Sequence, residues 1–144
     1  MESAAVENFD PDTSGLGGIP GTPNFPFDAT TVVAGQRVEV ESTTAVPTAG
    51  GNIIADKVKL QQQALVGTVS NFVAGSGGAA TFDLNLPTDS YLTLLAGQSV
   101  IHVFQQPGRD NRSGTITNTS TVRVRGLLFW TGTGFNMIAR RITP

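Results

Sequence analysis

The sequence predicts an all-β fold organised around one hairpin, and three observations lead to this class. Val122 and Val124 alternate with arginines, which is the period-two pattern of a strand with one buried face. A Gly/Thr turn over 131–134 and a second alternating segment ending at Ile142 complete a hairpin. Charged residues make up only 14% of the chain while Gly, Thr, Ser and Asn are abundant, so strands and turns are favoured over helices.

The same hairpin pattern occurs earlier in the chain at a constant offset of 84 residues. No gap is needed to align the two copies, so the pattern predicts an internal repeat. The matched positions are Val38, Val40, Asn52, Ile54, Ala55 and Val58 in the first copy, and Val122, Val124, Asn136, Ile138, Ala139 and Ile142 in the second. We therefore expect one complete β unit preceded by a partial copy.

Residues 1–29 form the first expected region, an extended arm rich in Gly and Pro. Its prolines and glycines oppose regular secondary structure. Phe9, Phe25 and Phe27 nevertheless make the arm more apolar than a typical disordered tail. We expect it to pack along its own domain or against a neighbouring chain.

Residues 30–63 form the second region, the partial repeat. Val38 and Val40 predict its first strand, a turn follows at 47–51, and the return strand is expected over 53–60. This copy has no counterpart of residues 64–84, because the offset places that counterpart before residue 1. Either the missing strands come from another molecule or the chain belongs to a longer repeat array, and we expect open strand edges.

Residues 64–144 form the third region, the complete repeat. Its opening hairpin has strands at 64–73 and 79–86 joined by a Gly-rich turn. A strand at 99–105 and the organising hairpin follow, and Thr115 with Ile116 is expected to form a short strand between them.

One short helix is expected near 88–96. Thr88 or Asp89 would cap its amino end, and Gly97 would end it. Alternation and size then predict the core. The expected core residues are Phe72, Phe82, Leu84, Leu86, Leu94, Val100, Val122, Val124, Phe129 and Ile138.

Four short segments occur in order in the complete repeat: Gly67-Thr68-Val69, Phe82-Asp83-Leu84, Val122 to Gly126, and Ala139 to Ile142. Together they resemble a family of tandem β-rich domains of unknown function in exported proteins and lipoproteins of Gram-negative bacteria. The resemblance covers 64–144 as a full unit and about 30–63 as a partial one. It implies small OB-like barrels, an exported location and no established activity, and it transfers no site residues. The first copy departs from the pattern because Ser42 stands where Gly126 stands.

We therefore expect a small OB-like barrel, with a flattened sandwich built from both copies as the alternative. An extracellular or cell-surface location is expected, although the chain shows no signal peptide, since an acidic start at Met1-Glu2-Ser3 has no apolar segment after it. No run of apolar residues is long enough to span a membrane.

The residues indicate no enzyme, no cofactor and no metal site. The chain has no cysteine and one histidine, His102, so neither a thiolate site nor a second imidazole ligand is available. Asp10 to Gly15 resembles the start of a calcium loop, but Gly21 stands where the twelfth-position Glu should be. We find no arrangement of nucleophile and base.

The first functional hypothesis is a non-enzymatic exported structural protein. Its copies would assemble by strand addition into a surface fibre or layer, so its expected partners are other copies of itself. Phe9, Phe25 and Phe27 would fill pockets on the neighbouring copy.

The second hypothesis is an OB-like binding module for a glycan, peptide or oligonucleotide. Arg123, Arg125 and Trp130 on the final hairpin would contact the ligand. We do not expect nucleic acid as the partner, because the formal net charge is −2. Solvation of an outward face explains the two arginines equally well.

Overall fold

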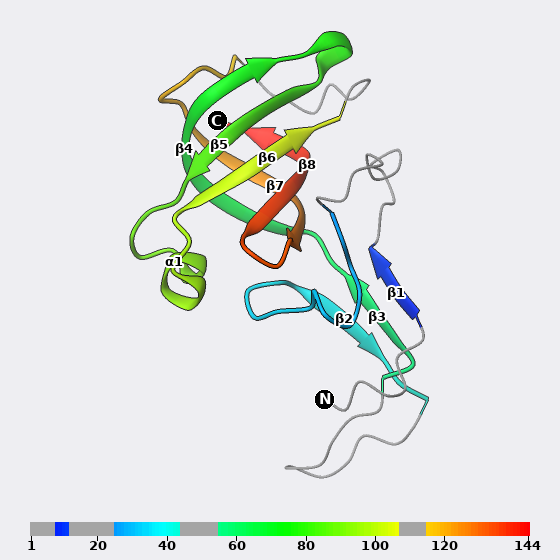
Figure 1. Ribbon diagram of the computed structural model, residues 1–144. Coiled ribbons are helices and arrows are strands. Elements are labelled where there is room, and N and C mark those ends of the chain that lie inside the picture. Colours follow the sequence, from blue (N-terminus) through cyan, green and yellow to red (C-terminus); the bar gives the residue numbers. More distant parts are fainter. Residues whose placement is uncertain (1–7, 12–24, 44–54, 107–114) are drawn as a thin grey trace.

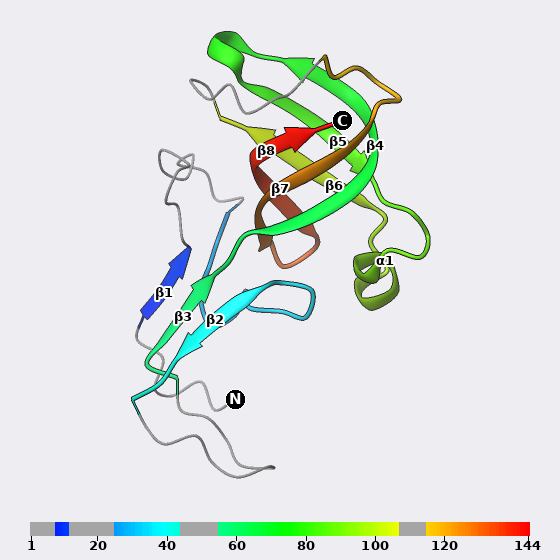
Figure 2. The ribbon, with the colours of Figure 1, turned by 180° about the vertical axis from the view of Figure 1, so that it is seen from behind.

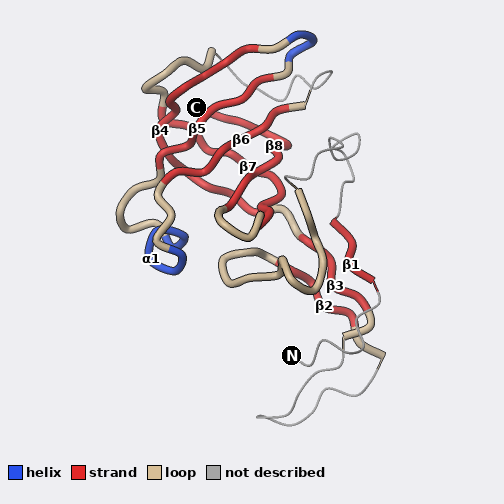
Figure 3. The backbone as a smooth tube through the Cα atoms, in the orientation of Figure 1, coloured by secondary structure: helices blue, strands red, loops and turns tan. Residues whose placement is uncertain are grey.

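The computed structural model shows a β-barrel with a three-stranded sheet beside it (Figure 1). It describes residues 8–11, 25–43, 55–106 and 115–144. Apart from one short α-helix and a 3-10 turn at Ser76–Gly78, the regular structure of these residues consists of strands (Figure 3). The prediction of an all-β fold with at most one short helix is confirmed.

Five strands close into the barrel in the order β4-β5-β6-β8-β7, with β7 returning to pair with β4. Neighbouring strands are antiparallel except β6 and β8, which run parallel. A five-stranded Greek-key barrel of this kind is the architecture of OB-like domains. The bounds are Gln63–Ala74 for β4, Ala80–Asn85 for β5, Val100–Gln105 for β6, Thr121–Trp130 for β7 and Phe135–Thr143 for β8.

The two hairpins expected in the complete repeat both form, as β4–β5 and β7–β8. In the β7–β8 turn, the Thr131 amide donates to the Gly134 carbonyl at 2.9 Å. Thr115 and Ile116, however, do not form the expected strand. Since β4 and β8 already occupy both edges of β7, the barrel offers this segment no free edge, and Ile116 is buried in the core instead.

A smaller sheet is formed by β1 (Asn8–Pro11), β2 (Val38–Glu41) and β3 (Lys57–Leu60). β3 lies in the middle, parallel to β1 and antiparallel to β2. β3 continues into β4 with only two residues between them, so the sheet and the barrel share one length of chain (Figure 2). The predicted turn at 47–51 and the start of the return strand lie outside the described residues.

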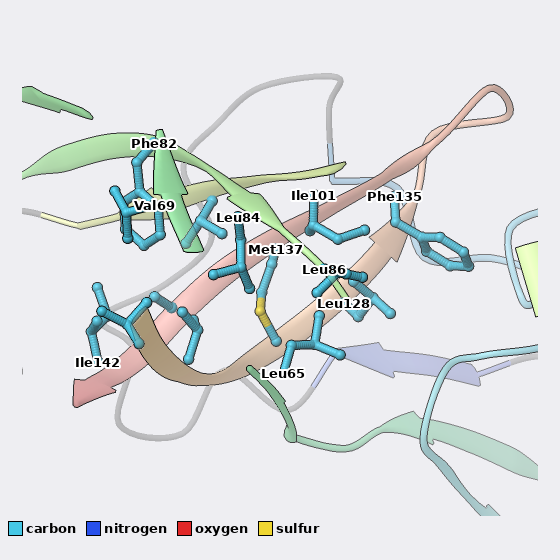
Figure 4. Close-up of a cluster of buried hydrophobic side chains, with 14 of the residues drawn as sticks. Leu65, Val69, Phe82, Leu84, Leu86, Ile101, Leu128, Phe135, Met137 and Ile142 are labelled. Carbon is cyan, nitrogen blue, oxygen red and sulfur yellow. The ribbon is translucent and has the colours of Figure 1, made fainter. Parts of the chain in front are cut away.

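The barrel interior holds the main hydrophobic core (Figure 4). On β5, Phe82 and Leu84 are fully buried, whereas Asp83 between them is partly exposed, as the period-two geometry of a strand requires. The expected core residues that prove to be buried are Phe82, Leu84, Leu86, Val122, Val124, Phe129 and Ile138.

Three expected core residues are not buried. Val100 is 43% exposed because Ile101, the next residue, takes the inner position on β6. Leu94 is 73% exposed because the single short helix turns only Leu92 into the core. Phe72 is partly buried at the edge of the core.

The helix α1 spans Tyr91–Ala96, within the expected range. Ser90 occupies its N-cap position without a side-chain hydrogen bond, so neither Thr88 nor Asp89 caps it as expected. The helix begins at Tyr91 and not near residue 88, so Thr88 and Asp89 lie in the turn before it. Gly97 ends the helix as predicted, in the left-handed conformation with φ of 66°.

A second apolar cluster lies on the outer wall of the barrel. Leu127 and Phe129 of β7 and Ile138 of β8 form the barrel side, and Phe25 and Leu60 cover them. Because Leu60 belongs to β3, this cluster fastens the small sheet to the barrel wall. Burial of these side chains from water stabilises the contact.

Gln63, the first residue of β4, anchors the joint through hydrogen bonds. Its Oε1 accepts from the Arg37 amide at 2.8 Å, and its Nε2 donates to the Gly35 carbonyl at 2.8 Å and to the hydroxyl of Tyr91. The buried amide is thereby fully satisfied. Gln63 thereby connects residues 35–37, which precede β2, with Tyr91 at the start of α1.

The two antiparallel hairpins β2–β3 and β7–β8 pair in corresponding registers. Val40 lies opposite Val58, and Val124 lies opposite Ile142, each pair being 84 residues from its counterpart. The neighbour relations correspond as well: β3 lies between a parallel and an antiparallel strand, and so does β8. The order β1-β3-β2 therefore corresponds to the order β6-β8-β7 of the barrel.

Candidate functional site

Strand β2 forms one edge of the small sheet. The Gln61 amide donates to the Arg37 carbonyl, and the Asp56 amide donates to the Glu41 carbonyl, both at 2.8 Å. The odd-numbered residues of β2 therefore hydrogen-bond toward β3, and the backbone groups of Val38 and Val40 point to the other side. No strand of the described residues pairs with that side. Such an edge is a ready template for pairing with another chain.

The apolar face of this sheet is only partly covered. Val58 in the centre is 1% exposed, but Val40 beside it on the edge is 44% exposed. The corresponding residue of the barrel, Val124, is completely buried. Val40 thus presents an apolar side chain to solvent at a position where the closed barrel hides one.

The opposite face of the small sheet is charged. Glu39 and Glu41 lie on β2, exposed to solvent, and lie opposite Lys59 and Lys57 of β3. Lys57 Nζ also lies 3.2 Å from a carboxylate oxygen of Asp10 on β1. The edge strand itself carries only negative charge.

The structure packs the three predicted assembly residues against other residues of their own chain. Phe25 is 7% exposed, with its ring centroid 5.1 Å from that of Phe104 and 5.3 Å from that of Phe129. Phe9 and Phe27 pack edge to face at 5.8 Å and are partly buried. Phe25 covers the barrel wall in the single chain, so a role in a neighbour's pocket would require it to leave that cluster.

The predicted ligand-binding residues do not meet on one surface. Arg123 and Arg125 are exposed on the outer face of β7, as expected from the alternation. Trp130 lies at the end of the same strand, about 17 Å beyond Arg125. It packs on the core side against Phe135, with ring centroids 4.9 Å apart. The outer face between them is buried under the Phe25 cluster.

A polar cluster that sequence reasoning missed occupies the outer face of β4, β5 and β6. His102 Nδ1 lies 2.6 Å from Asp83 Oδ1, and Asn71 Nδ2 donates to Asp83 Oδ2 at 2.8 Å. The hydrogen bond from Asn71, followed by that from His102, lowers the pKa of Asp83 below its ordinary value. The His102 ring rests edge-on against Phe104 at 4.7 Å.

This cluster positions an imidazole but brings no nucleophile to it. Ser70 lies opposite Asp83, and Asp83 lies opposite His102, so the carboxylate stands between serine and imidazole. Nucleophilic catalysis needs the imidazole between the other two groups. Only the cross-strand register reveals the pair, since Asp83 and His102 are far apart in sequence and carry no motif.

The structure adds two observations on metals and membranes. In the described residues, no three His, Asp or Glu side chains gather as they would around a metal ion. The calcium-like segment after Asp10 lies almost entirely outside those residues. The described helix is far shorter than a membrane-spanning helix would be.

Comparisons with known proteins add no identity. Neither a scan against protein-family models nor a search of curated proteins found a match for the chain.

Proposed function

We propose that this chain is a non-enzymatic structural protein whose copies assemble by strand addition at the β2 edge. The observation that carries this proposal is Val40, which is 44% exposed on an edge strand although its barrel counterpart Val124 is fully buried. Exposed edge strands with an apolar face are the usual sites of β-augmentation.

The barrel indicates what the small sheet lacks. In the barrel, β4 pairs with β7, and β5 pairs with β6. The small sheet has counterparts of β6, β8 and β7, so a hairpin like β4–β5 would complete it. The 84-residue offset between the hairpins supports reading the sheet as a partial repeat of the barrel.

β2 is the more receptive of the two edges. β1 ends at Pro11, which has no backbone N–H to donate to an incoming strand. On β2, the outward N–H and C=O groups of Val38 and Val40 pair with no strand of the described residues, so an incoming strand can form a new ladder with them. An incoming strand with alternating apolar side chains would pair with them and cover Val40.

Assembly of this type joins two different surfaces of identical chains. Such head-to-tail contacts form an open filament unless the rotation between copies closes a ring. The expected product is a surface fibre or layer outside the cell, the location that the resemblance of the sequence to exported β-rich domains implies.

The test compares two changes of one residue. Val40→Pro removes an outward N–H that β3 does not use, whereas Val40→Ala keeps this N–H and trims an exposed side chain. We expect wild type and Val40→Ala to form oligomers or filaments, seen by light scattering and negative-stain imaging. Val40→Pro should remain near the 15.0 kDa mass of one chain. Equal assembly of all three proteins would contradict strand addition at β2.

A point change tests the proposal more cleanly than removal of residues 1–29. Deleting that segment would also remove Phe25 and expose Leu127 and Phe129 on the barrel wall. Lost or altered assembly would then have two explanations. Circular dichroism of the Val40→Pro protein should show the strand content and melting temperature of wild type, because the barrel does not contain this residue.

A second candidate is an OB-like binding module for a glycan, peptide or oligonucleotide. The polar cluster beside Phe104 favours it, since carboxylate, amide and aromatic groups together suit a sugar, and the corresponding barrel face binds ligands in OB folds. The substitutions His102→Ala and Trp130→Ala would distinguish ligand binding at the β5–β6 face from ligand binding at the β7–β8 turn. In glycan binding measured by calorimetry, loss with His102→Ala alone would assign the site to β5–β6.

A further inference from the structure

Three exposed arginines stand together on the outer wall of the barrel. Arg123 and Arg125 of β7 and Arg141 of β8, here called the arginine face, all point to solvent. Arg125 and Arg141 are direct cross-strand partners, an arrangement in which like charges repel. Among the described residues, no acidic side chain forms an ion pair with any of them. The described part of the chain therefore leaves the positive charge of the arginine face without an ion-pair partner.

The acidic counterpart lies on the edge strand of the small sheet. Glu39 and Glu41 are exposed on β2, and each lies 84 residues before Arg123 or Arg125. Both pairs have the i, i+2 spacing of a strand, about 7 Å between side chains on the same face. Two carboxylates and two guanidinium groups at this spacing can therefore meet pair by pair. The Glu39 carboxylate also accepts a hydrogen bond from Gln61 Nε2 at 2.8 Å.

The separation of charge extends through the whole chain. Residues 1–56 contain eight Asp and Glu and one Arg, whereas residues 57–144 contain three acidic residues and eight Lys and Arg. A total charge of −2 thus conceals an acidic half and a basic half. Complementary halves of this kind steer identical molecules into a head-to-tail orientation.

We propose that the arginine face of one copy docks on Glu39 and Glu41 of β2 in a second copy. This inference rests on the proposed function, because it names the surface of the neighbour that lies against the β2 edge. The side chains of Glu39 and Glu41 stand out from the sheet, while its open hydrogen bonds lie in the plane of the sheet. Charge contact and strand addition can therefore occur at the same strand.

A second copy is a better occupant than a polyanion such as nucleic acid. The exposed carboxylates of Glu39 and Glu41 would repel a polyanion, whereas they attract the arginine face of another copy. Within one chain no ion pair joins the two surfaces among the described residues. β2 runs away from the barrel (Figures 1 and 2), and Glu39 and Glu41 on it are exposed.

Charge reversal tests the docking directly. Glu39→Arg/Glu41→Arg makes both surfaces basic, and Arg123→Glu/Arg125→Glu makes both acidic. Each double variant should assemble about tenfold more weakly than wild type, measured as the concentration at which light scattering detects oligomers. An equimolar mixture of the two variants should regain assembly, because each then offers the charge that the other lacks. Asp89→Arg, a charge change in the loop before α1, should leave assembly unchanged.

Salt dependence gives an independent readout. Assembly of wild type should be weaker at about 0.5 M salt than at about 0.05 M, because ions screen exposed charges. All four positions are on the surface, so Arg123→Glu/Arg125→Glu should keep the melting temperature of wild type within a few degrees. Glu39→Arg/Glu41→Arg places basic side chains opposite Lys59 and Lys57 and should melt slightly lower, and circular dichroism checks that both variants stay folded.

The outcomes separate this inference from the proposed function. If wild type assembles and Val40→Pro abolishes assembly while both charge reversals have no effect, strand addition stands and the arginine contact is refuted. A mixture of reversed variants that stays dissociated also refutes it. So does binding of heparin or single-stranded oligonucleotide that is lost in Arg123→Glu/Arg125→Glu without any change in assembly. If wild type stays monomeric at every concentration and salt, both proposals fail.

Discussion

The hairpins β2–β3 and β7–β8 share one pairing register but have different surroundings. Val40 and Val124 occupy corresponding positions, each opposite an aliphatic residue of the next strand. Val124 is buried because β4 closes the barrel on its other side, whereas Val40 remains 44% exposed. Alternation therefore determines which side chains share a face. Whether that face is buried depends on strands that lie elsewhere in the chain or in another molecule.

The two hairpins also differ just beyond the residues that pair in corresponding registers, that is, after Glu41 and after Arg125. In β7–β8 a β-bulge follows Arg125, and Gly126 lies so close to β8 that a Cβ atom there would come 1.9 Å from the Ile138 carbonyl oxygen. The small sheet has Ser42 at this position, and β2 ends at Glu41. Thr43 donates its amide to the Asp56 carboxylate just beyond this end. The glycine lets β7 continue past the bulge to Trp130.

The largest predicted effect concerns this glycine. Gly126→Ala should lower the free energy of unfolding by about 3 kcal/mol, because a backbone atom of β8 must move to admit the methyl group. Ser42→Ala at the corresponding position should cost less than about 1 kcal/mol. Urea unfolding followed by Trp130 fluorescence measures both. Equal costs would show that the bulge does not depend on glycine.

The next effect compares the paired valines. Val124→Ala should cost roughly 2 kcal/mol, since two buried methyl groups are lost and a cavity remains. Val40→Ala should cost less than about 0.5 kcal/mol in the monomer, because that side chain is already half exposed. The same unfolding experiment, at a concentration below that of assembly, tests the difference. A large cost for Val40→Ala would mean that the edge is covered in the single chain.

The smallest effect is a dependence on pH that compares a barrel carboxylate with one in the small sheet. Hydrogen bonds from Asn71 and His102 lower the pKa of Asp83 from its ordinary value of 3.8, so its contribution to stability is present above that value. As the pH falls through the lowered pKa, this contribution is lost. Asp83→Asn should remove less than about 1 kcal/mol of acid-dependent stability, because the carboxylate is partly exposed.

The corresponding change in the small sheet is Asp56→Asn. The Thr43 backbone hydrogen bond lowers the pKa of Asp56 as well, but this side chain is fully exposed. We expect a smaller change in the acid limb of its stability curve than for Asp83→Asn. Thermal melts between pH 2 and pH 6 would show both, and an equal flattening of the two curves would refute the ranking.

The sequence predicted the fold where the signal is local. Alternation in β5 and β7 identified the buried positions Phe82, Leu84, Val122 and Val124, and Gly97 marked the end of the helix. Leu94 and Val100 were misplaced because apolar character alone does not tell the phase of a short element. Burial of Leu92 and Ile101 shows that the phase is shifted by one or two residues.

The candidate surfaces were harder to predict because they depend on pairing between distant residues. Asp83 and His102 meet only through the β5–β6 register, and Arg125 meets Arg141 only across the β7–β8 hairpin. For the Gly/Pro-rich arm that holds Phe25, the sequence left open whether it packs along its own domain or against a neighbouring chain. The Phe25 ring packs against Phe104 and Phe129 of its own barrel wall, residues that no local pattern connects to it.

Closure of the barrel by β4 and β7 also has a consequence for how the chain folds. Hairpins β4–β5 and β7–β8 join neighbouring segments, but Gln63 must find Gly126, and Thr68 must find Thr121. Contacts between such distant residues slow folding, to roughly milliseconds or seconds. Throughout that interval the β4 and β7 edges are unpaired and can meet a second nascent chain. Exchange of strands between copies would then be decided during folding, before the barrel has closed.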